Sequence, residues 1–208
     1  FAYSQGMESA LKHGLVSTYE DVERYLHTLM GQILSFDLPF VQAANDQYLQ
    51  QAEGEWNDIV NTFEAMLMNP LLRKSSEVMG KNIISLFKDI HTGGSLDQVW
   101  RYFQEHTLSF HFPIAFGIIS AELHIESGQW KQAYFYTCLR DQVSAMTRLG
   151  FIGSRGAQEL LARLTAKAYT LVKEKPFIGH YSEASRSAYM MDLAQLNHSQ
   201  IYSKLFQN

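Results

Sequence analysis

The stretch His111-Phe112-Pro113-Ile114-Ala115-Phe116-Gly117 lies near the middle of this 208-residue chain and predicts the start of an apolar helix. Proline fixes φ and lacks an N–H, so Pro113 suits the first turn of a helix, where amide groups have no intrahelical partner. His111 then lies beside the free N–H groups of the helix start. A histidine here can cap the helix or satisfy a buried carbonyl, which we favour, or it can act directly in function.

Apolar residues recur at helical spacing along nearly the whole sequence, and no strand-like alternation extends beyond about five residues. Ser17-Thr18-Tyr19-Glu20 predicts a capping box with Ser17 as the N-cap. Asp37 is predicted to cap the next helix, and Gly128 to separate two later helices.

The C-terminal part of the chain is predicted to form a last amphipathic helix and an apolar tail over residues 186–208. The apolar stripe of this segment comprises Met190, Leu193, Leu196, Ile201 and Leu205. Terminal segments are usually polar and frayed, so this tail is expected to dock, either on its own fold or on a partner. The whole sequence predicts one all-α domain of about ten helices over residues 1–208.

The amino-acid composition argues against several classes of protein. Hydrophobic residues make up 46% and charged residues 18% of the chain, and the net charge is −4, which argues against nucleic acid as a partner. The single cysteine, Cys138, excludes an internal disulfide framework and fits a reducing compartment such as the cytoplasm. No run of eighteen apolar residues occurs, so no membrane-spanning helix and no membrane partner are expected.

The sequence holds no recognisable motif for metal, nucleotide or nucleophilic chemistry. The chain has eight histidines, and no two of them are three or four residues apart, so no helix presents a His–His pair on one face. There is no G-x-x-x-x-G-K-[ST] phosphate loop and no G-x-S-x-G elbow. We therefore expect no catalytic residue, no cofactor and no metal site within one subunit, although assembly of ligands from distant helices stays open.

Three further blocks accompany the central stretch: Phe1-Ala2-Tyr3-Ser4-Gln5-Gly6-Met7-Glu8, then Arg148-Leu149-Gly150-Phe151-Ile152-Gly153 with Gln158, and finally His198 with Tyr202-Ser203-Lys204-Leu205-Phe206. In this order and rough spacing, the four blocks resemble the UreF family of urease accessory proteins. That family typically has FAYSQGLE, HFPVAFG, RL followed by G-x-x-x-x-Q, and HE-x-L-Y-S-R-L-F. The family usually also has a preceding segment ending in L-P-x-G. Since this chain begins at Phe1, we expect its native N-terminal segment to be absent.

The resemblance implies a non-enzymatic maturation factor that acts in the cytoplasm. Such a protein would dimerise, bind UreD (also called UreH) through its terminal segments and form a platform for the GTPase UreG. The assembly would deliver nickel to apo-urease. The residues expected to contact partners are Phe1, Tyr3, Ser4, Glu8, His111, Pro113, Phe116, Arg148, Gln158, His198, Tyr202, Lys204, Leu205 and Phe206.

The sequence departs from the family pattern at two tail positions. Lys204 replaces the usual Arg and loses the planar fork that binds carboxylates, and Ser199 replaces a Glu. Two other classes remain: an all-α small-molecule binder or helical oxygenase-like enzyme, and a helical adaptor unrelated to urease. A deep pocket containing His and Glu side chains would favour the enzyme.

Overall fold

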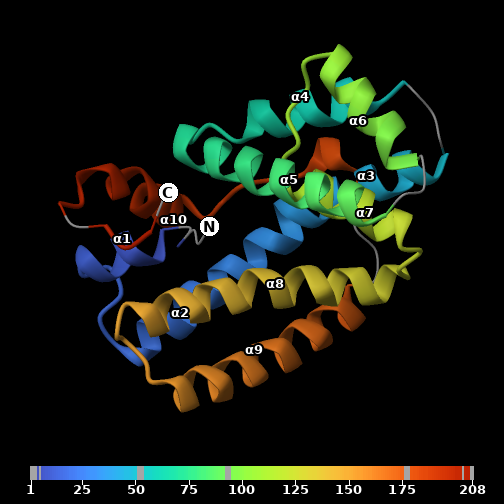
Figure 1. The fold of residues 1–208 in the computed structure, drawn as a ribbon. Helices are drawn as coiled ribbons and strands as arrows, with labels where there is room; N and C mark the ends of the chain where they lie inside the picture. The colour runs from blue at the N-terminus through green and yellow to red at the C-terminus, as the bar shows by residue number, and fades with distance from the viewer. Residues whose placement is uncertain are drawn as a thin grey trace. The chain divides into compact units, whose positions relative to one another are not determined.

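The computed structural model describes residues 4, 6–50, 54–91, 95–175, 179–202 and 204–206. These residues form ten α-helices with short π and 3-10 turns, and no strand occurs among them (Figure 1). The prediction of an all-α fold of about ten helices is therefore confirmed. No helix in this part of the chain combines the length and the apolar character that crossing a membrane requires.

The helices belong to two compact units. Unit 1 contains residues 1–33, 128–177 and 186–208. Its elements are α1 (Met7–Lys12), α2 (Tyr19–Gln32), all but the first residue of α8 (Ser127–Arg148), α9 (Ser154–Glu174), α10 (Tyr189–Leu196) and the 3-10 turn η3 (Asn197–Gln200).

In unit 1, the short helix α1 packs against α10 and η3, so the two ends of the described chain meet. Helix α9 lies along α2, because Arg163 forms an ion pair of 2.8 Å with Glu23, and Lys167 Nζ lies 2.8 Å from His27 Nε2. The core of this unit includes Cys138, which is 4% exposed, as expected for a small apolar residue on a helix face.

The N-terminus of α2 begins with a capping box, one residue later than predicted. Thr18, not Ser17, is the N-cap, and Asp21, not Glu20, is the N3 partner. The Asp21 carboxylate accepts from the backbone amide of Thr18 at 2.8 Å, and Thr18 Oγ1 accepts from the amide of Asp21 at 3.2 Å. The hydrogen bonds that the Asp21 carboxylate accepts from the Thr18 hydroxyl and from the backbone amides of Thr18 and Ser17 hold the pKa of Asp21 well below its ordinary value. The prediction was one residue early because Ser17 and Thr18 are adjacent residues that can both serve as N-cap, and Glu20 and Asp21 are adjacent acidic residues that can both serve as its N3 partner.

Unit 2 contains residues 34–127 and 178–185. Its elements are most of the π-helical turn η1 (Ile33–Asp37), α3 (Leu38–Gln50), α4 (Trp56–Met66), α5 (Pro70–Ile90), α6 (Ser95–Glu105), α7 (Phe112–Glu122) and the 3-10 turn η2 (Tyr181–Glu183). Helix α7 is central, since it packs along both α3 and α5. Its central position agrees with its sequence, because nearly every residue of α7 is apolar and buried.

The core of unit 2 is aromatic. The rings of Phe36, Phe40 and Phe63 are mutual neighbours, with centroids 5.0–5.3 Å apart. Tyr181 from η2 packs against Phe40 and donates from its hydroxyl to the Asp58 carboxylate at 2.9 Å. Burial, together with that hydrogen bond, raises the pKa of Tyr181 to about 12. Buried aromatic pairs of this kind each add about 0.5–1.5 kcal/mol beyond the area they bury.

Gly117 is the last residue of the central stretch, and the packing of α7 against α3 accounts for a glycine at this position. A Cβ atom at this position would lie 2.4 Å from the carbonyl oxygen of Val41 and 2.9 Å from Cβ of Ala44 on α3. The side-chain amide of Asn45 also donates to the Gly117 carbonyl at 3.3 Å. The close approach of α3 and α7 therefore requires a residue without a side chain.

Two predicted helix boundaries are wrong. Asp37 lies inside π-helical backbone that leads directly into α3, and a residue that stays helical cannot act as an N-cap. Gly128 is the second residue of α8 and does not separate that helix from α7; the connecting turn lies before Ser127.

Candidate partner-binding surface

Glu8 on α1 is a buried carboxylate that contacts several polar groups of unit 1. Its side chain is fully buried, and one carboxylate oxygen accepts from the Leu205 amide at 2.8 Å and pairs with Lys12 Nζ at 3.0 Å. The other oxygen accepts from the Phe206 amide at 3.2 Å and lies 3.0 Å from His198 Nε2. Burial by itself raises the pKa of Glu8, but these hydrogen bonds outweigh burial, so the pKa is lowered. Glu8 therefore fastens the C-terminal tail to the first helix.

The described residues of the tail differ sharply in burial. Ile201 and Phe206 are buried, and the guanidinium of Arg148 lies 5.8 Å from the centroid of the Phe206 ring, within the range of a cation–π contact. Tyr202 is fully exposed, and Leu205 is 65% exposed. The tail thus docks on its own fold through its backbone and Phe206, and the side chains of Tyr202 and Leu205 stay in contact with solvent.

Helix α10 carries large apolar side chains on its solvent face. Tyr189, Met190, Leu193 and Leu196, named here the α10 apolar face, are 70%, 62%, 50% and 42% exposed. The side chains that pack inward are instead Met191, Ala194 and Gln195. The amphipathic stripe predicted from the sequence is correct in spacing, and Met190, Leu193 and Leu196 of that stripe are largely exposed.

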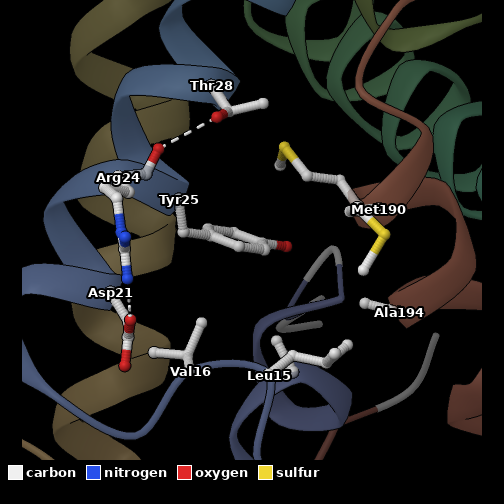
Figure 2. Close-up of a pocket in the computed structure, with 10 residues that line it drawn as sticks. Leu15, Val16, Asp21, Arg24, Tyr25, Thr28, Met190 and Ala194 are labelled. Carbon is white, nitrogen blue, oxygen red and sulfur yellow. Dashed lines mark hydrogen bonds and ion pairs between the residues drawn. The ribbon is translucent and has the colours of Figure 1, made fainter.

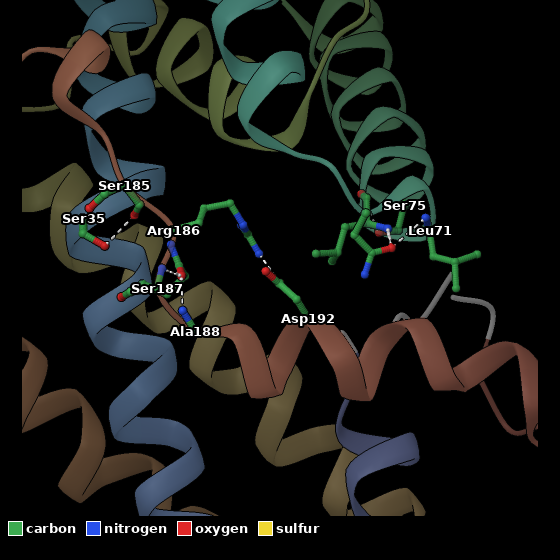
Figure 3. Close-up of polar contacts among 11 residues, drawn as sticks. Ser35, Leu71, Ser75, Ser185, Arg186, Ser187, Ala188 and Asp192 are labelled. Carbon is green, nitrogen blue, oxygen red and sulfur yellow. Dashed lines mark hydrogen bonds and ion pairs between the residues drawn. The ribbon is translucent and has the colours of Figure 1, made fainter.

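The start of α10 is fixed by polar contacts (Figure 3). Gln32 at the end of α2 accepts from the amides of Ser187 and Ala188 at 3.2 and 3.1 Å. Arg186 forms an ion pair with Asp192 in the first turn of the helix, where a negative charge also complements the helix dipole. The α10 apolar face is therefore exposed on an anchored helix.

A pocket of about 300 Å³ lies beside this face (Figure 2). It is lined by Ala10, Leu15, Val16, Asp21, Arg24, Tyr25, Thr28, Met190, Met191 and Ala194. Tyr25 from α2 and Met190 from α10 face each other across it, while Asp21 and Arg24 pair with each other at its edge. Among the described residues, no His, Glu or Cys lines this pocket, so these residues suit an apolar group.

The central stretch is packed inside unit 2. His111 is the N-cap of α7, yet its side chain makes no capping hydrogen bond. Its imidazole is fully buried, lies 4.7 Å from the ring of Phe63 and places Nε2 at 3.1 Å from Glu64 Oε1. Burial lowers the pKa of His111, and Glu64 opposes that effect. Pro113 is buried and Phe116 half-buried, so packing is the role these positions show, and a partner contact through them stays a prediction.

The remaining predicted site residues have different surroundings. Ser4 is buried, and its carbonyl accepts from Gln142 Nε2 at 3.1 Å. Gln158 on α9 and Lys204 in the tail are exposed. Phe1 and Tyr3 lie outside the described residues. The structure thus brings together Glu8, Arg148, His198 and the tail in unit 1, while His111, Pro113 and Phe116 belong to unit 2.

Two groups of residues were missed by reasoning from the sequence. Met190, Leu193 and Leu196 were assigned to an amphipathic stripe without a direction, and Tyr189 was not included; apolar residues on both faces of α10 could have signalled an exposed face. Glu64, Glu77 and His111 place ligand-type atoms within 4.8 Å of one another in unit 2. They come from separate helices, so their spacing in sequence carries no signal.

Comparison with known proteins agrees with the resemblance of the four blocks. The family model described as UreF matches residues 16–165. The chain is 29% identical to "Urease accessory protein F" of Oryza sativa subsp. indica, over 99% of this chain and 78% of the rice protein. It is also 29% identical to the Arabidopsis thaliana protein of that name, over 99% of this chain and 85% of the relative. The "Urease accessory protein UreF" of Azoarcus sp. (strain BH72) is 26% identical over 100% of this chain and 88% of its own length. Because the family model covers most of the sequence, this chain belongs to the UreF family.

Proposed function

We propose that this chain is a non-catalytic scaffold in the maturation of urease, and that it binds its first partner through the α10 apolar face. The observation that carries the proposal is the exposure of four large apolar side chains on a helix whose start is anchored by hydrogen bonds. Contiguous exposed apolar surface of this kind is typical of protein–protein interfaces. The relatives are named as accessory proteins of urease, which supplies the pathway.

The partner proposed for this surface is UreD, also called UreH, as the sequence resemblance implies. Tyr202 and Leu205 add two exposed apolar side chains in the tail, and tyrosine is enriched among the residues that dominate interface energies. Once bound to UreD, the scaffold would dimerise, recruit the GTPase UreG and present apo-urease for nickel insertion in the cytoplasm. In this proposal GTP hydrolysis and nickel transport are properties of the assembly.

The alternative of an all-α enzyme has less support. An enzyme would need convergent acid–base groups in a pocket. The pocket between α2 and α10 is walled by apolar side chains, and its two charged residues pair with each other. An apolar pocket bordered by an exposed apolar face fits the insertion of a partner side chain better than it fits catalysis.

The proposal is tested by pull-down of purified UreD with variants of the α10 apolar face. Leu193→Glu places a charge at the centre of the face, and we expect loss of UreD binding with unchanged helical content by circular dichroism. Leu86→Glu on α5 is the matched control, since Leu86 is 55% exposed and Leu193 50%. Retention of UreD by Leu193→Glu, or equal loss in both variants, would contradict this assignment.

The tail contribution is tested separately with Tyr202→Ala combined with Leu205→Ala. Both side chains are exposed, so this double variant removes apolar contact area without removing a residue that anchors the tail. Phe206→Ala is unsuitable for this purpose because Phe206 is buried. A urease-activation assay, with and without excess nickel, then decides whether loss of UreD binding abolishes maturation.

A further inference from the structure

Three metal-ligand side chains from separate elements meet in unit 2. Glu64 extends from α4, Glu77 from α5 and His111 from the N-terminus of α7. Their ligand atoms all lie within 4.8 Å of one another, and His111 Nε2 is 3.1 Å from Glu64 Oε1. Two ligands bound to one ion at adjacent positions, each with a bond of about 2.1 Å, are about 3 Å apart. The measured separation of imidazole nitrogen and carboxylate oxygen therefore fits neighbouring ligands of one ion.

Contacts between α5 and the segment that carries His111 hold Glu77 and His111 near each other. Gly80 lies on the same face of α5 as Glu77, three residues later, and a Cβ atom there would lie 2.1 Å from the Phe110 carbonyl oxygen. Ser76 Oγ accepts from the Phe112 amide at 3.0 Å. The segment that carries His111 is thus fastened directly to the turn of α5 that carries Glu77.

Helix α4 is joined to α5 on the other side of the cluster. Arg73 Nη2 donates to the carbonyl oxygens of Glu64 at 2.6 Å and Leu67 at 3.3 Å. These carbonyls belong to the last turn of α4 and its C-cap, where backbone acceptors lack helical partners. Arg73 therefore fixes the backbone of Glu64 relative to α5, and the site is preorganised from both sides.

The buried imidazole has one nitrogen without a partner. His111 is 0% exposed, and its Nδ1 forms no hydrogen bond within the described part of the chain. The nitrogen that faces Glu64 is Nε2, so an ion beside the two carboxylates would be bound by Nε2. The Glu64 and Glu77 side chains are 29% and 28% exposed, so an ion can reach the cluster from solvent.

We infer that Glu64, Glu77 and His111 form a binding site for one divalent first-row transition-metal ion. Oxygen-only sites suit Mg²⁺ and Ca²⁺, whereas an imidazole nitrogen shifts the preference to ions such as Ni²⁺, Co²⁺ and Zn²⁺. Three protein ligands leave coordination positions for water or for another protein's ligand. Lys74 lies 3.7 Å from Glu77 and must move aside or weaken binding. The site is a property of the isolated chain and does not depend on the proposed scaffold function.

The test is isothermal titration of the full chain with Zn²⁺, Ni²⁺ and Mg²⁺, comparing wild type with Glu77→Gln and Glu64→Gln. We expect one Zn²⁺ or Ni²⁺ site that weakens at least about tenfold in both variants, and no Mg²⁺ binding. Glu105→Gln, at an exposed position of the same unit, is the matched control for lost charge. His106→Gln controls for binding at an exposed imidazole.

A thermal-unfolding measurement gives a second readout. An ion that binds only the folded chain raises its Tm, and we expect added Zn²⁺ to do so in wild type but not in Glu77→Gln. Unchanged affinity and stoichiometry in Glu77→Gln and Glu64→Gln, or loss of binding only in His106→Gln, would overturn the site. UreD pull-down of Glu77→Gln separates the two proposals, because the scaffold proposal expects that variant to bind UreD normally.

Discussion

His198 Nε2 lies 3.0 Å from Glu8 Oε2, and both side chains are fully buried although 190 positions separate them in the chain. Glu8 belongs to the first helix and His198 to the last 3-10 turn, so this contact joins the two ends of the described chain. The same carboxylate binds the amides of Leu205 and Phe206. One buried carboxylate thus holds His198, Leu205 and Phe206 against α1.

Replacing the Glu8 carboxylate tests this role. Glu8→Gln keeps the shape of the side chain but replaces one acceptor oxygen by a donor, which then faces a backbone amide. A hydrogen bond to a charged group contributes about 1.5–3 kcal/mol, so we expect the tail to detach at a cost of about 2 kcal/mol. Hydrogen exchange of the Leu205 and Phe206 amides should become much faster. Glu20→Gln, at an exposed position of α2, should leave exchange unchanged.

The stability of the tail contact should depend on pH through Glu8. Its folded pKa is below the ordinary value of 4.5, so the charged form is favoured by folding. The stabilisation is complete above pH 4.5 and is lost as pH falls through the lower folded pKa. Urea unfolding between pH 3 and 7 should show this loss in wild type but not in Glu8→Gln. Parallel curves for the two proteins would refute the assignment to Glu8.

Substitution of Gly117 tests the close approach of α3 and α7. The new methyl group of Gly117→Ala would meet the Val41 carbonyl at 2.4 Å, so we expect a loss of about 2–3 kcal/mol in the free energy of unfolding. Gly31→Ala is the matched contrast, because a Cβ at this helical position meets nothing within 4 Å. It should gain up to about 1 kcal/mol from higher helix propensity. Equal effects of the two substitutions in urea titrations would contradict the packing described here.

Substitutions of Phe206 and Leu205 should differ in their effect on the tail, although the two residues are neighbours in sequence. Phe206 is 5% exposed and contacts Arg148, whereas Leu205 is 65% exposed. Phe206→Ala should release the tail and make it sensitive to limited proteolysis. Leu205→Ala should leave cleavage unchanged, since exposed substitutions usually alter stability by less than about 0.5 kcal/mol. Similar cleavage of both variants would show that the Phe206 ring does not anchor the tail.

The helical fold was predictable from the spacing of apolar residues and from the positions of prolines. The apolar spacing of Trp56, Ile59, Val60 and Phe63 gave α4, and proline at position 70 marked the start of α5. Boundaries were less predictable, because Ser17 and Thr18 are nearly equivalent caps and only the hydrogen bonds of Asp21 distinguish them.

The direction of an apolar stripe was not predictable in α10. Met190 and Leu193 repeat at helical spacing, as core residues do, yet Met191 and Ala194 on the opposite face are the buried ones. Periodicity identifies a face of a helix, but only the neighbours of that helix determine which face is covered.

By itself, the sequence determined the all-α class, the positions of most helices and, through its four blocks, the family. These properties are local, since they depend on residues close together along the chain or on motifs read in order. The tertiary structure alone decided that Glu8 holds the tail, that the α10 apolar face points outward and that Glu64 and Glu77 meet His111. Each of these arrangements joins side chains from separate helices, and the distances among such side chains are set by packing, which no spacing in the sequence encodes.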